Sequence, residues 1–136
     1  MSQEYFDKHF SDKIPTLAKA EQTENRSKNI CYGAFALLAI AIAISGEPVP
    51  DTLTTLVYAA LFGVAAYARK VWLFVVISIL FGASFAFDGV NSRELLKEDD
   101  AEWFATALFA GAEALLAYAF FMWAAAISRV SSMTNQ

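Results

Sequence analysis

The sequence predicts an all-α, polytopic membrane protein with four transmembrane helices in an up-down bundle. Its 136 residues are 57% hydrophobic and have a mean hydropathy of +0.43, which is high for a soluble domain of this length. The apolar residues gather in four stretches with almost no charge, 30–45, 52–68, 71–87 and 103–128. Helices of a soluble bundle show a recurring polar face, which FALLAIAIAI lacks. Because a bilayer core takes roughly 20 helical residues, we expect all four stretches to span it.

Residues 1–29 precede the first stretch and have a different pattern, which indicates a separate cytoplasmic segment. Its apolar residues recur at the spacing of one helix face and form a predicted interfacial anchor: Phe6, Phe10, Ile14 and Leu17. An amphipathic helix of this kind lies along the membrane surface, although Pro15 is expected to break it into two pieces. Docking onto a partner protein is the alternative role.

Short polar connections separate the four stretches. SGEPVPD joins the first two and contains residues that stop a helix. Only Arg69 and Lys70 separate the second stretch from the third, which predicts a tight antiparallel hairpin. The longer connection, DGVNSRELLKEDDAEW, contains a variant of the capping box, NSRE, and this predicts a short helix over 92–97. Residues 129–136 form a short tail after the fourth stretch.

Lysine and arginine lie mostly on one side of the predicted bundle. With the N-terminus inside, eight of the ten basic residues fall on the inner side: Lys8, Lys13, Lys19, Arg26, Lys28, Arg69, Lys70 and Arg129. The outer loops hold Arg93 and Lys97 among many carboxylates. Basic residues favour the cytoplasmic side, so we expect both termini in the cytoplasm and the protein in a bacterial inner membrane. This charge distribution gives no indication of nucleic-acid binding.

Small residues recur four positions apart within the spans and predict faces for close helix packing. Such residues supply much of the helix association in lipid, because the hydrophobic effect contributes little there. The candidate packing residues are Ala59, Gly63, Ser78, Gly82, Ala86, Ala107, Ala110, Gly111 and Ala114. The triple on the third stretch, Ser78, Gly82 and Ala86, is the least expected by chance in an alanine-rich chain.

Glu113 is a carboxylate inside the fourth stretch. On a helical wheel it shares its side with small residues, so it is expected to face protein. It lies about 15 Å from Trp103 at 1.5 Å per residue, near the bilayer midplane, where the chain has no basic residue. Ser78 and Tyr58 lie at matching depth and can donate hydrogen bonds to it. With no cation nearby, desolvation favours the neutral acid. Glu113 is therefore predicted either to join helices by hydrogen bonds or to bind a proton or cation.

No set of residues indicates catalysis, a cofactor or a metal site. The chain has a single histidine, His9, and a single cysteine, Cys31, and these are far apart. The carboxylates at 99, 100 and 102 lack the spacing of a calcium-binding loop. It contains neither a catalytic triad nor a glycine-rich phosphate loop. We therefore expect a protein without enzymatic activity, whose partners are the lipid bilayer and other membrane subunits.

Three functions fit this pattern. The first is an interaction protein, either an accessory or regulatory subunit of a membrane assembly or a homo-oligomer. The second is a proton- or cation-coupled small channel or transporter that uses Glu113. Small multidrug exporters also have four helices, but their essential glutamate lies in the first helix, where this chain has none. The third is an immunity protein that binds a pore-forming toxin within the membrane.

Overall fold

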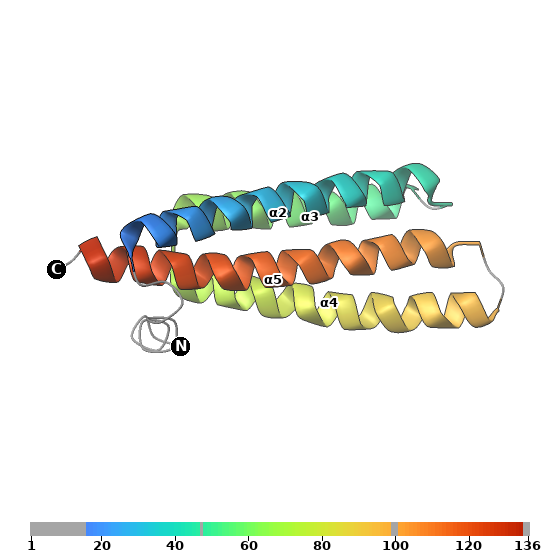
Figure 1. Ribbon diagram of the computed structural model, residues 1–136. Coiled ribbons are helices and arrows are strands. Elements are labelled where there is room, and N and C mark those ends of the chain that lie inside the picture. Colours follow the sequence, from blue (N-terminus) through green and yellow to red (C-terminus); the bar gives the residue numbers. More distant parts are fainter. Residues whose placement is uncertain (1–15, 47, 99–100, 135–136) are drawn as a thin grey trace.

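The computed structural model describes residues 16–46, 48–98 and 101–134, and this part of the chain forms four helices (Figure 1). They are α2 (Leu17–Ile44), α3 (Pro48–Ala68), α4 (Val71–Lys97) and α5 (Trp103–Thr134). Each contains a stretch long and apolar enough to cross a membrane. The structure thus confirms four apolar helices and is consistent with an integral membrane protein.

The helix ends follow from local chemistry. The Thr16 hydroxyl oxygen accepts a hydrogen bond from the Lys19 backbone amide at 3.1 Å and so caps α2. α3 begins with Pro48, a residue suited to the first helical position because that amide needs no partner. Arg69 ends the same helix with a φ of +52°, the left-handed conformation that reverses the chain before α4.

The N-terminal helix predicted within residues 1–29 is not supported. Phe6, Phe10 and Ile14 lie outside the described residues, whereas Leu17 is the first residue of α2. Residues 17–29 continue into the first apolar stretch as one helix, because they are rich in alanine, lysine, glutamate and glutamine, which favour helix.

The separate short helix predicted over 92–97 is wrong, because α4 runs without a break through that region. The charge that follows Phe87 ends the apolar stretch but does not end the helix. The Ser92 hydroxyl donates to the Trp103 carbonyl oxygen at 2.9 Å and so ties the extended part of α4 to the start of α5.

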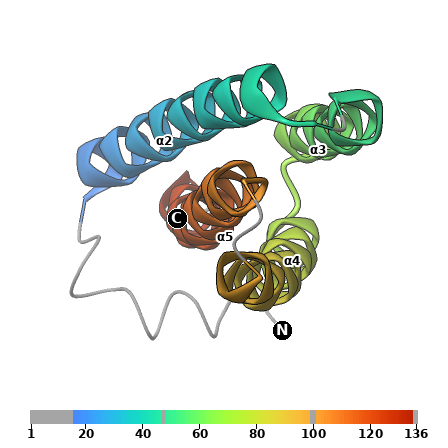
Figure 2. The same cartoon turned by 90° about the vertical axis from the view of Figure 1, so that its right-hand side faces the viewer.

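α5 is the central helix of the structure. It packs along α2 on one side and α4 on the other, whereas α3 lies beside the group and touches α2 and α4 far less (Figure 2). The start of α2, the end of α5 and the Arg69 turn lie at one end of the molecule, here called the terminal end. The connections from α2 to α3 and from α4 to α5 lie at the other, the loop end.

Candidate functional site

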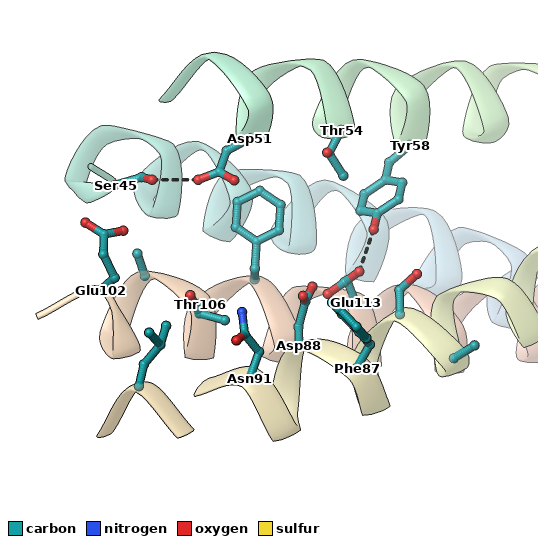
Figure 3. A pocket seen from close by; sticks show the side chains of 15 residues that line it. Ser45, Asp51, Thr54, Tyr58, Phe87, Asp88, Asn91, Glu102, Thr106 and Glu113 are labelled. Carbon is teal, nitrogen blue, oxygen red and sulfur yellow. Dashed lines mark hydrogen bonds between the residues drawn. The ribbon is translucent and has the colours of Figure 1, made fainter. Parts of the chain in front are cut away.

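Glu113 lies on the part of α5 that faces the other helices, and its side chain is fully buried. The Tyr58 hydroxyl, from α3, donates a hydrogen bond to Glu113 Oε2 at 2.5 Å (Figure 3). The Ser78 hydroxyl, from α4, donates instead to the Ala117 carbonyl oxygen at 2.6 Å. The structure therefore brings together Glu113 and Tyr58, while Ser78 joins α4 to α5 one turn away.

A cavity of about 670 Å³ leads from the loop end to Glu113. α3, α4 and α5 form its walls, and four carboxylates line it: Asp51, Asp88, Glu102 and Glu113. Among the described residues that line it, none is lysine, arginine or histidine. Glu102 lies near the loop end and Glu113 about 16 Å further along α5, at 1.5 Å per residue. The cavity is thus a negatively charged path that reaches the middle of the helices.

Hydrogen bonds hold the loop end of this cavity together. The Ser45 hydroxyl donates to Asp51 Oδ2 at 2.6 Å, and the Gly46 backbone amide donates to Glu102 Oε1 at 2.7 Å. Both bonds connect the α2–α3 turn to a lining carboxylate. The two carboxylates nearest the loop end are therefore held in place by the protein.

The carboxyl groups of Asp88 and Glu113 form a pair deeper in the cavity. Asp88 extends from α4 toward Glu113, and the two groups interact (Figure 3). Glu113 Oε1 is buried and has no hydrogen-bond donor among the described residues. An ionised carboxylate can only accept hydrogen bonds, and two of them side by side repel each other, so a positively charged donor between them would stabilise the pair. Glu113 therefore has one oxygen that Tyr58 satisfies and one that is open to such a group.

Aromatic side chains pack together beyond Glu113, toward the terminal end. The Tyr58 ring lies 4.9 Å from the Phe81 ring, centroid to centroid, and Phe81 lies 5.5 Å from Phe120. These rings continue into a buried aromatic cluster with centroid distances between 4.7 and 6.2 Å, formed by Phe62, Phe74, Phe81, Phe120 and Trp123. This cluster lies between the cavity and the terminal end.

An ionic network lies on the far side of the aromatic cluster, at the terminal end. Arg69 donates to both carboxylate oxygens of Glu24, at 2.5 and 3.3 Å. Trp123 Nε1 donates to Glu24 Oε1 at 3.3 Å, and Lys28 Nζ lies 3.7 Å from the same oxygen. Hydrogen bonding to Glu24 raises the pKa of Arg69 above its ordinary value, so the arginine stays charged. This network joins α2, the α3–α4 turn and α5.

Some of the predicted packing residues are covered by other helices, and others are exposed on the surface of the chain. Ser78, Gly82, Ala107, Ala110 and Ala114 are buried or half-buried, whereas Ala59, Gly63, Ala86 and Gly111 are exposed. A Cβ atom added at Gly63, Gly82 or Gly111 would meet no described atom within 4 Å. Close backbone approach at these glycines is therefore absent from the described residues of the single chain.

The sequence pattern missed three of the four lining carboxylates and the whole ionic network. Asp51, Asp88 and Glu102 fall in SGEPVPD and DGVNSRELLKEDDAEW, the two connections that the sequence predicts as outer loops. A usable signal was present for one of them, because Ser84, Asp88 and Asn91 are spaced four and three residues apart and so share one helix face. Glu24 and Arg69 are far apart in sequence, and no local pattern connects them.

The chain has no detectable likeness to a known protein. Comparison with protein-family models, with curated proteins and with solved structures gives no match. No group of three or more histidine, cysteine or acidic side chains within 16–46, 48–98 and 101–134 could hold a metal ion. The function must therefore be argued from the acidic cavity and Glu113.

Proposed function

We propose that this protein is a small proton- or cation-coupled membrane channel or transporter in which Glu113 is the binding residue. One observation carries the proposal: Glu113 is fully buried and lines a cavity together with three other carboxylates. A carboxylate at membrane depth is costly and marks ion pathways by default. A cleft lined by one sign of charge also concentrates the oppositely charged ion.

The proposal includes an orientation in which the four helices form an up-down bundle in a bacterial inner membrane. Described basic residues gather at the terminal end, including Lys28, Arg69, Lys70 and Arg129. The positive-inside rule then places both termini in the cytoplasm and the cavity entrance outside. Reporter fusions at each terminus test this orientation, and an external position for either one would contradict it.

Flux through proteoliposomes tests the role of Glu113. The purified protein is reconstituted, and the decay of an imposed pH or cation gradient is followed for the original chain and for Glu113→Gln, which keeps the side chain's shape. We expect Glu113→Gln to abolish saturable flux. The matched control is Glu94→Gln, an exposed carboxylate on α4 outside the cavity, for which flux should stay unchanged. Equal flux in the original chain and in Glu113→Gln would mean that Glu113 only joins helices.

A second candidate function, an interaction subunit or homo-oligomer, is favoured by the exposure of α3. Of the described side chains of α3, only Ala65 is fully buried. The small residues Ala59 and Gly63 lie on its exposed surface, where another helix could approach closely. Native mass spectrometry of the protein in lipid nanodiscs tests this candidate, because it weighs the complex directly. A monomer alone would count against it, whereas a fixed foreign partner would make the chain an accessory subunit.

A further inference from the structure

We propose that the cavity takes a small organic cation with N–H donors, an ammonium or guanidinium compound, which binds between Asp88 and Glu113. This inference rests on the proposed function and names its ligand class. Three features of the cavity carry it: its volume, its mixed lining and the open oxygen of Glu113.

The volume and the walls fit an organic molecule better than a bare ion. Small-molecule sites commonly have volumes of about 300–1,000 Å³, and this cavity, whose lining is mixed polar and apolar, measures about 670 Å³. Aromatic side chains from three helices line it beside the carboxylates: Tyr58, Phe87 and Phe109. Aromatic faces attract cations, and most strongly where water is excluded. The described residues offer no cluster of acidic, histidine or cysteine side chains suited to a metal ion.

One oxygen of Glu113, at the deep end of the cavity, lacks a hydrogen-bond donor within the part of the chain that the structure describes. Glu113 Oε2 accepts from Tyr58, whereas Oε1 is buried without a donor among the described residues and lies beside the Asp88 carboxyl. An ammonium or guanidinium group carries several N–H donors and a positive charge. It can therefore bridge the two carboxylates by charge-assisted hydrogen bonds. A quaternary ammonium compound has the charge but none of these donors.

Binding then competes with protonation. Without the cation, the buried Glu113 carboxyl holds a proton in this proposal; when the cation binds, that proton leaves toward the loop end. The other titratable groups that line the cavity are Tyr58 and Asp51 from α3 and Glu102, which directly precedes α5, while α2 contributes only its C-cap, Ser45, to the described lining. All of these groups are acids, so raising the pH can only add negative charge to the cavity. Cation binding should therefore become stronger as the pH rises.

Calorimetry in nanodiscs of phosphatidylcholine, a zwitterionic lipid, tests the inference with four probes. They are phenethylammonium, its N,N,N-trimethyl analogue, the neutral 2-phenylethanol and Mg²⁺. We expect phenethylammonium to bind saturably, with tighter binding at higher pH and with release of a proton to a pH-sensitive dye. Loss of the N–H donors should weaken the trimethyl analogue by about tenfold or more, and 2-phenylethanol and Mg²⁺ should not bind saturably.

Variants separate binding in the cavity from partition into lipid. Glu113→Gln and Asp88→Asn should each weaken phenethylammonium binding by about tenfold or more, and Glu113→Gln should also abolish proton release. Glu94→Gln should bind like the original chain, and far-UV circular dichroism checks that every variant is folded. Unchanged binding by Glu113→Gln, or equal binding of the trimethyl analogue, would overturn the inference.

Two outcomes distinguish this inference from the proposed function. Glu113-dependent binding of Mg²⁺, or of protons alone, without phenethylammonium binding would refute the organic cation and leave the proposed function standing. Absence of any Glu113-dependent binding together with unchanged flux in Glu113→Gln would refute both.

Discussion

The ion pair between Glu24 and Arg69 should be a measurable source of stability. Two N–H groups of Arg69 bond to Glu24, whose side chain is only 11% exposed, whereas the Arg69 side chain is 43% exposed. Hydrogen bonds to charged groups contribute about 1.5–3 kcal/mol, and fully exposed ion pairs about 0.2–1 kcal/mol. Because one partner is buried and the other is screened by solvent, we expect a coupling free energy of about 1–2 kcal/mol, between these limits.

A double-mutant cycle measures this coupling. Glu24→Met, Arg69→Met and the double variant are unfolded in detergent micelles by titration with sodium dodecyl sulfate, and helix content is followed by far-UV circular dichroism. The chain supplies a matched control pair, Glu94 and Lys97, which are 3.8 Å apart and 60% and 65% exposed. The control cycle should give no more than about 0.5 kcal/mol. If the two cycles gave the same coupling free energy, the buried position of Glu24 and its two hydrogen bonds from Arg69 would add nothing, and the reasoning would be refuted.

Three further predictions follow from buried groups. Tyr58→Phe removes the donor to Glu113 but keeps the ring, and should lower the free energy of unfolding by about 1–3 kcal/mol; an equal loss in the exposed control Tyr118→Phe would contradict this. Trp123→Ala should lower the free energy of unfolding by about 3–5 kcal/mol in the same titration, since Trp123 is fully buried. A decrease below about 1 kcal/mol would argue against the packing of the aromatic cluster. Cys31, the only cysteine, is fully buried, so a maleimide should label it only after unfolding; rapid labelling of the folded protein would show that α2 packs differently.

Hydropathy was sufficient to find the four helices, because each contains an uninterrupted apolar stretch. The turn at Arg69 and Lys70 was equally predictable, since only these two charged residues separate two long apolar stretches and a longer connection is impossible. Helix ends were harder to predict from the sequence. Charge ends an apolar run, but it does not end a helix of good helix formers, and so α2 begins at Leu17 and α4 continues to Lys97.

The site was predictable only where a residue contrasts with its surroundings. Glu113 is conspicuous inside an apolar stretch, and Tyr58 could be matched to it by depth. Asp88 was not conspicuous, because it follows the apolar run directly and reads as the first residue of a loop. Its contact with Glu113 depends on the extra turns of α4 and on how α4 packs against α5, and neither can be read from residue spacing alone.

The central place of α5 has a consequence for how the protein is made. α2, α3 and α4 precede it along the chain, yet α5 supplies most of the packing for α2 and α4. During translation, α2 and α4 are made before the helix that supplies most of their packing is complete. Until α5 is made, α2 and α4 lack their main packing partner, and each is held mainly by its own backbone hydrogen bonds. Assembly of the core, and of the cavity with it, waits for the synthesis of α5.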